Sequence, residues 1–160
     1  MRKHVSAFTG IMLLLIITNI PSLFAQDPRM RTVGELASTN LYLTYISIGA
    51  VADSHSRQIY GDEFAASLMK SIAGLTRNAV SSLRRVADTE NLDKEDKRNL
   101  EEIIATLEIL IDQAESYHKY IVTKSEQYIS IYNSYKQLSE QKVGILLKLE
   151  KKILSDQTGK

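Results

Sequence analysis

The clearest capacity for chemistry in this chain lies in Glu115 and His118, which form a Glu-x-x-His motif. Residues three apart share one face of a helix, so this carboxylate and imidazole can face the same metal ion. Di-iron carboxylate bundles use two such motifs, and the sequence holds no second one. We therefore expect no cofactor, with a site for one divalent metal built from His55, Glu115 and His118 as the alternative hypothesis.

Tyrosine gives a second signal, because most of the eight Tyr residues fall near helix ends that are expected to meet, together with His55 and His118. Aromatic rings with polar tips suit a small-molecule pocket. They also suit simple packing, in which the hydroxyl groups reach the end of a bundle or water. Packing is the first interpretation, and the alternative is a ligand site lined by Tyr60, Tyr117, His118, Tyr128 and Tyr132.

Four amphipathic segments must position these side chains. Apolar residues recur at steps of three and four, which is typical of helices, and helices are expected at about 33–58, 62–88, 93–122 and 126–154. Thr32 and Glu35 have the spacing of a capping box at the start of the first helix. The helical domain is expected over 32–155, with disordered tails at 26–31 and 156–160.

Helices of similar length with short connections become antiparallel neighbours, so the expected fold class is all-α, an antiparallel up-down four-helix bundle. This arrangement brings the end of the first helix, the start of the second, the end of the third and the start of the fourth to one pole. The break at 123–125 contains neither Gly nor Pro. A helical hairpin packed on one long coiled-coil helix over 93–155 is therefore the alternative.

The apolar stripes of the second and third helices predict which side chains form the core. In the second helix the stripe consists of Phe64, Leu68, Ile72, Leu75, Ala79, Leu83 and Val86. In the third it consists of Leu100, Ile103, Ile104, Leu107, Leu110, Ile111, Ala114, Tyr117 and Ile121.

The first helix differs, because the stretch from Leu36 to Ala52 contains no charged residue and is apolar nearly all round. Such a helix is normally buried on several sides. It either lies deep in the bundle or uses its outer face for a dimer contact. The residues assigned to that contact are Leu41, Tyr45, Ile48 and Ala52.

The first 25 residues have the organisation of a secretory signal peptide. Arg2 and Lys3 precede an apolar stretch that is strongest over Ile11–Ile20, and cleavage is expected after Ala25. A membrane span needs about 20 apolar residues, and Pro21 interrupts this stretch sooner. Export of a chain without Cys favours a bacterial periplasm or the cell exterior. A retained N-terminal segment would instead give a membrane-tethered sensor or adaptor.

Composition excludes several classes of function. The formal charge of +1 offers no concentrated basic surface for nucleic acid, and the absence of Cys excludes disulfides and thiolate chemistry. Nucleophile motifs and Gly-rich phosphate loops are missing. We therefore expect an exported, non-enzymatic bundle that binds a protein partner or forms a homodimer, without membrane contact after cleavage. The alternative is a small-molecule- or metal-binding bundle with its site at the Tyr- and His-rich pole.

Overall fold

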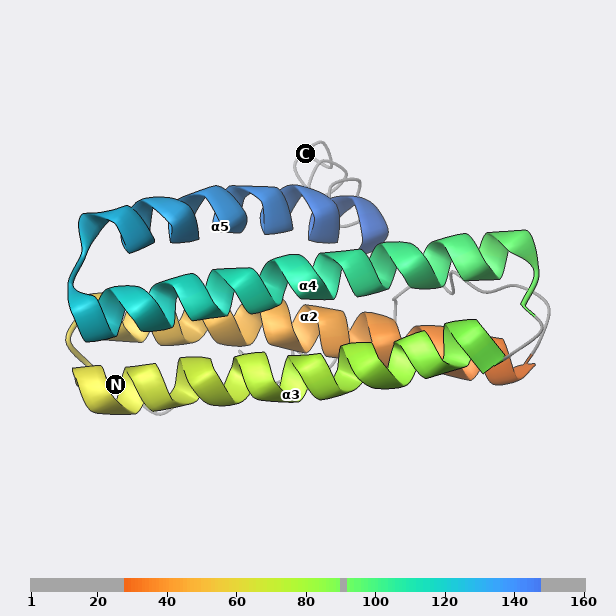
Figure 1. Cartoon of the computed structure of the whole chain (residues 1–160), viewed down its shortest axis with the longest axis horizontal. Helices are drawn as coiled ribbons and strands as arrows, with labels where there is room; N and C mark the ends of the chain where they lie inside the picture. Colours follow the sequence, from red (N-terminus) through yellow and green to blue (C-terminus); the bar gives the residue numbers. More distant parts are fainter. Residues whose placement is uncertain (1–27, 90–91, 148–160) are drawn as a thin grey trace, which may run out of the picture.

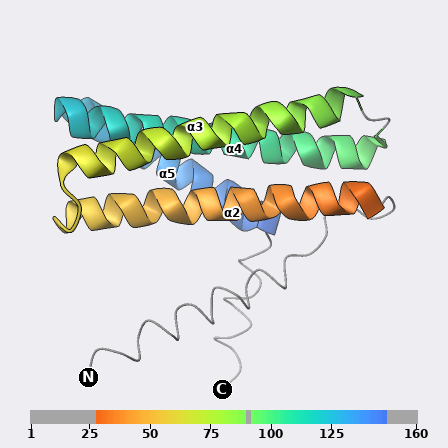
Figure 2. The same ribbon diagram turned by 90° about the horizontal axis from the view of Figure 1, so that it is seen from below.

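The computed structural model describes residues 28–89 and 92–147, and these residues form an all-α four-helix bundle. The helices are α2 (Pro28–Ser56), α3 (Asp62–Thr89), α4 (Lys94–Thr123) and α5 (Glu126–Leu147). They lie side by side and alternate in direction along the chain (Figure 1). Helix α4 packs against each of the other three helices. From below, α2 lies on one side of the bundle, with α3 and α4 close together on the other (Figure 2).

Some expectations fall outside this range. The predicted signal peptide over 1–25, the last part of the helix expected at 126–154 and the tail at 156–160 all lie outside the described residues. Within the described residues, no helix combines the length and the apolar character that crossing a membrane requires.

The break between α4 and α5 confirms two helices in place of one long helix. Lys124 adopts a left-handed backbone conformation with φ of 54°, and its amide donates to the Tyr120 carbonyl at 2.7 Å. This is the usual way in which a helix satisfies its last carbonyl groups, although Gly is the commoner residue there. The Thr123 hydroxyl also accepts from the Ser125 amide at 3.3 Å. A continuous helix over 93–155 is therefore wrong, although neither Gly nor Pro marks the turn.

Helix α2 begins earlier than expected, at Pro28, so residues 28–31 are helical and not part of a tail. Pro suits the first position of a helix because its fixed φ is already helical and its missing amide proton is not needed there. Thr32 does not cap the helix, since its hydroxyl donates to the Pro28 carbonyl at 3.0 Å. Glu35 pairs with Arg31 at 3.1 Å. The capping-box interpretation is wrong because the helix already continues through these residues.

Helix α4 begins at Lys94, directly after Asp93, where the acidic residues of the sequence predict a helix start. The Asp93 side chain accepts from the amides of Glu95 and Asp96 at 2.9 and 2.8 Å, which satisfies donors that the first turn of a helix leaves unpaired. All residues of the predicted α4 stripe are buried. Large aliphatic side chains at regular helical spacing therefore identified the core face of this helix correctly.

The predicted stripe of α3 is rotated from the face that is buried. Phe64 and Leu75 are 54% and 71% exposed. The buried side chains of α3 are mostly smaller ones: Ala65, Met69, Ala73, Thr76 and Val80. Small residues let the backbones of α3 and α4 approach closely, so size at the contact outweighs hydrophobicity in setting the rotation of this helix.

Candidate functional site

The expected pole is formed by the two turns at one end of the bundle, between α2 and α3 and between α4 and α5 (Figure 1). Both turns place a residue other than Gly in the left-handed region, with φ of 58° at Gln58 and 54° at Lys124. In the first turn, the amides of Ile59 and Tyr60 both donate to the Ser54 carbonyl, at 2.8 and 3.2 Å. These turns fix the ends of all four helices near one another.

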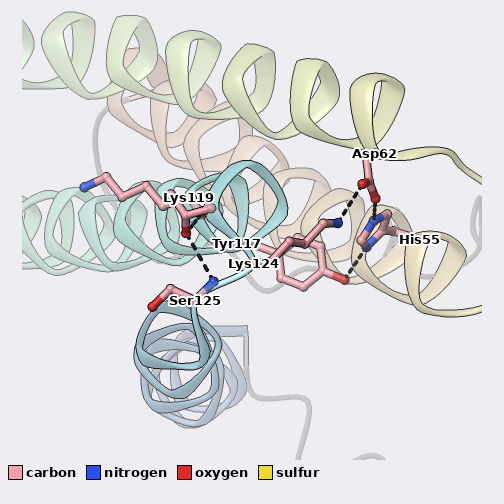
Figure 3. A network of polar contacts seen from close by, with 7 residues as sticks. His55, Asp62, Tyr117, Lys119, Lys124 and Ser125 are labelled. Atoms are coloured by element: carbon pink, nitrogen blue, oxygen red, sulfur yellow. Dashed lines mark hydrogen bonds and ion pairs between the residues drawn. The ribbon is translucent and has the colours of Figure 1, made fainter.

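A polar network at this pole joins three segments through His55 of α2. The imidazole Nδ1 lies 3.1 Å from the Tyr117 hydroxyl of α4, and Nε2 lies 2.8 Å from Oδ1 of Asp62, at the start of α3. Asp62 Oδ2 also pairs with Lys124 Nζ at 2.7 Å. Figure 3 shows these four side chains converging from the helix ends. The network therefore ties both turns together.

The protons of this network can be counted. The Tyr117 hydroxyl donates to the Ala52 carbonyl at 3.1 Å, and a hydroxyl has only one proton to give. Its oxygen is then left to accept from His55 Nδ1. An ionised Asp62 carboxylate can only accept, so Nε2 must also donate. All three contacts are hydrogen bonds at the same time when both ring nitrogens of His55 carry a proton.

The pKa of Asp62 reflects the same contacts. Hydrogen bonds from His55 and then from Lys124 stabilise the ionised carboxylate and hold its pKa below the usual range. Asp62 is exposed, while the His55 side chain is only 12% exposed. The acid of this pair thus faces solvent and the imidazole lies inside, next to the aromatic rings.

Tyr117 is the centre of an aromatic cluster. Its ring centroid lies 4.6 Å from that of Tyr132 on α5 and 5.7 Å from those of Tyr120 and His55. Burial, with smaller effects of Tyr132 and Tyr120, raises the pKa of Tyr117 to about 12. Tyr117 consequently stays protonated at neutral pH, and its ring packs against its aromatic neighbours.

A second buried polar group lies next to the rings. The Ser139 hydroxyl of α5 donates to Gln113 Oε1 of α4 at 2.8 Å, and both side chains are buried. Gln113 also hydrogen-bonds Tyr132, whose pKa is raised chiefly by burial. Polar side chains thus connect α5 to α4 within the core. Among the described residues, every buried side-chain nitrogen and oxygen atom has a hydrogen-bond partner.

The residues of the hypothetical ligand site do not line a single pocket. Tyr117 and Tyr132 stack in the core, while Tyr60 packs edge-on against Phe64 at 5.0 Å. The ring of Tyr128 lies under the Lys119 ammonium group at 5.7 Å. His118 is partly buried and takes no part in the network around His55. The up-down topology brought the right helix ends together, but it did not determine the direction of each side chain.

The residues of the hypothetical metal site are also divided. Glu115 forms an ion pair with Arg77 of α3, and His55 is engaged with Tyr117 and Asp62. Within 28–89 and 92–147, no three His, Cys, Asp or Glu side chains are grouped so as to hold a metal ion. Glu115 of the Glu-x-x-His motif therefore links α4 to α3 through its ion pair with Arg77.

Sequence reasoning missed Lys124 and Gln113. Lys124 lay in a break without an obvious turn residue, and its left-handed backbone was the feature that directed it toward Asp62. Gln113 did carry a signal, because it is a polar residue within the mainly apolar sequence that forms the α4 core face. A polar residue at such a position must find a buried partner, here Ser139.

A second region of interest is the contact between α2 and α3, where two shallow grooves share Asn40. The first groove is lined by Val33, Leu36, Ala37, Asn40, Ala79, Ser82, Leu83 and Val86. The second is lined by Asn40, Leu43, Thr44, Ser47, Ile72, Leu75 and Thr76. No charged residue lines either one. Together they form one continuous uncharged groove, which we call the α2–α3 groove.

Several charged residues of these helices form ion pairs outside the groove lining. On α3, Arg77 pairs with Glu115 and Arg84 with Glu108, so both arginines face α4. On α2, Arg31 pairs with Glu35 at 3.1 Å and Arg57 with Asp53 at 2.9 Å. These two pairs lie on either side of the uncharged stretch. Arg85 of α3 lies closer to the groove, because its guanidinium donates to the hydroxyl of Ser82, a lining residue, at 3.2 Å.

The residues assigned to a dimer contact lie on the wrong side of α2. Leu41 and Ile48 are fully buried, Ala52 is 8% exposed and Tyr45 is partly buried. Because α2 is apolar nearly all round, its sequence alone did not distinguish the inner face from the outer one. The outer apolar residues are Leu36 and Leu43, at the edge of the α2–α3 groove.

No protein-family model, curated protein or solved structure matches this chain. Two regions of the described structure could carry a function, the pole and the α2–α3 groove.

Proposed function

We propose that this protein is a non-enzymatic binding module that holds an apolar face of a helical protein partner in the α2–α3 groove. The observation that carries the proposal is the uncharged and largely apolar lining of that groove, with Leu36 and Leu75 exposed at 66% and 71% along its edges. Single exposed apolar residues are ordinary on protein surfaces. Apolar residues gathered along one groove are typical of a site of interaction.

The shape of the groove favours a helix as the bound element. It follows two antiparallel helices from Val33 to Ser47 of α2, which corresponds to about 20 Å at a rise of ~1.5 Å per residue. A helix of about four turns has this length. An amphipathic helix binds an apolar groove through its own side chains at steps of three, four and seven, and Leu36 and Leu43, seven residues apart, offer contacts two turns from each other.

The pole supports the groove and is not itself the proposed binding site. His55, Asp62 and Lys124 join the start of α3 to α2 and to the end of α4. The Tyr117 hydroxyl is engaged with His55 Nδ1 and with the Ala52 carbonyl, and His55 Nε2 is engaged with Asp62. These groups therefore position the two helices that line the groove.

The proposed place of action is the bacterial periplasm or the cell exterior. It rests on the signal-like sequence of residues 1–25 and on the absence of Cys. Loss of Arg2 and Lys3 with the signal would make the formal charge slightly negative. Partners in this proposal are proteins and not nucleic acid.

Photo-crosslinking in living cells tests the proposed function. A photoreactive amino acid is placed at Leu36 in the groove or, as a matched control, at Ile145 on α5, because each side chain is 66% exposed. We expect a covalent adduct from position 36 that is lost when Leu75→Glu is added, and none from position 145. Equal adducts from both positions, or no adduct from position 36, would contradict the proposal.

A further inference from the structure

We infer that the protein partner is a second copy of this chain, with α2 of each copy lying antiparallel to α2 of the other along the edge of the α2–α3 groove that Leu36 and Leu43 form. This inference rests on the proposed function and names its partner. Three observations carry it: the spacing of the outward residues of α2, the distribution of charge around them, and their sizes.

The outward face of α2 carries a regular row of uncharged side chains. The row consists of Leu36, Thr39, Leu43, Ile46 and Ala50, all exposed or partly buried. Their steps of three and four are those of the contact face between paired helices. The steps from Thr39 to Ala50 are four, three and four, and they read the same in the opposite direction. A second α2 in antiparallel orientation can therefore present matching positions from Thr39 to Ala50.

The charges favour a partner with the same surface. An uncharged stretch runs from Leu36 to Ala52, and each of its ends carries an ion pair that neutralises itself, Arg31–Glu35 and Asp53–Arg57. A partner helix with charged groups would lose their hydration without finding an opposite charge in the groove. A second copy brings charges that are already paired: with Leu43 against Ile46 of the partner subunit, Leu36 lies opposite the partner subunit's Asp53, which forms an ion pair with Arg57 at 2.9 Å. Apolar, charge-depleted contacts are characteristic of homodimers.

The sizes of the side chains also fit a two-fold arrangement. When Leu43 meets Ile46 of the partner subunit, the same register brings Thr39 opposite the partner subunit's Ala50. Two large side chains then lie next to the axis on each side, and small ones lie beyond them. A two-fold contact requires such self-complementarity, because each pairing occurs twice.

The test is the oligomeric state of the purified mature protein, measured by sedimentation equilibrium from about 1 to 100 μM. We expect a dimer whose dissociation constant rises at least about tenfold in Leu43→Glu, because two carboxylates would be buried near the axis. Ile145→Glu on α5 is the control and should leave the constant unchanged, since Ile145 lies outside the groove. Circular dichroism confirms that both variants are folded.

A second measurement keeps the result independent of folding. Leu43→Glu mixed in equal amounts with Leu43→Lys should associate more tightly than either variant alone, because opposite charges then face each other across the axis. A monomer up to 100 μM, or a dimer that Leu43→Glu does not weaken, would overturn the second copy as occupant. If the cross-link from position 36 then joins a different protein, the proposed function stands and only the second copy is refuted. If no adduct forms, the proposed function and the second copy as partner are both refuted.

Discussion

Helix α3 meets α4 and α2 across two contacts of opposite character. Toward α4 it presents small side chains such as Ala65 and Ala73, and its arginines pair with Glu108 and Glu115. Toward α2 it presents an uncharged groove whose larger apolar residue, Leu75, is mostly exposed. The first contact is closed by the chain itself, whereas the second leaves apolar surface in reach of another molecule.

This difference shows how one helix can serve stability on one side and binding on the other. Small residues and ion pairs complete the α3–α4 contact, so this contact presents little surface to which another molecule could bind. The α2–α3 contact depends more on its ends, where the His55, Asp62 and Lys124 network joins the helices at the pole. Variants that act on one contact alone can sharpen or refute this division.

The largest expected effect is in the closed core. Leu107→Ala removes a fully buried side chain of α4 and should lower the free energy of unfolding by about 2–5 kcal/mol, because it leaves a cavity. Leu36→Ala in the groove should change it by less than about 0.5 kcal/mol. Urea denaturation at low and equal protein concentrations measures both. Similar losses for the two variants would refute the division.

An intermediate effect is expected at the pole. Tyr117→Phe leaves the Ala52 carbonyl and His55 Nδ1 without their partner and should cost about 1–2 kcal/mol at neutral pH. It should also change the response to alkali. The folded-state pKa of Tyr117 is about 12 against a usual value of 10.0, so its contribution is complete below pH 10 and is lost as the pH rises toward 12.

Unfolding experiments at pH 7, 9 and 11 test this sign. The unmodified protein should lose stability between pH 9 and 11, and Tyr117→Phe should lose less. Part of the decline should remain, because the pKa values of Tyr45 and Tyr132 are also raised, in both cases chiefly by burial. An equally steep decline in Tyr117→Phe would show that this hydroxyl is not held in the core.

The smallest effect is expected from the ion pairs of the closed contact. Arg77 and Glu115 are 51% and 36% exposed, so Arg77→Gln should cost no more than about 1 kcal/mol, and less in high salt. Lys70→Gln is the control, because Lys70 lies two turns earlier on α3 and forms no ion pair among the described residues. Thermal unfolding at low and high salt compares the two variants. A loss of stability in Arg77→Gln that exceeds about 1 kcal/mol and does not change with salt would assign Arg77 a packing role.

Much of the fold could be predicted from the periodicity of apolar residues. The stripe of α4 is correct because large aliphatic side chains occupy its core positions, Leu100 and Leu107 among them. The stripe of α3 is not, because Ala65 and Ala73 are buried in preference to the larger Phe64. Which face of a helix is buried depends on how closely its neighbour approaches, and that is a property of the pair.

The pole was predictable in position but not in detail. Up-down connectivity alone places His55 and Tyr117 at the same end of the bundle. Their contact depends on the rotation of α2, and the role of Lys124 depends on a left-handed residue that no Gly or Pro announced. The α2–α3 groove was missed for a similar reason, because it exists only once Leu36 is known to face outward.

The central place of α4 has a consequence for the order of synthesis. When the chain has been made as far as Thr89, α2 and α3 are complete, but Leu100, Leu107 and Leu110, against which they pack, have not yet been added. The 30 residues of α4 are then required before a core can close. Until that point only α3 can cover apolar side chains of α2, and the side of α2 that packs against α4 stays exposed. A nascent chain of this kind depends on protection from aggregation.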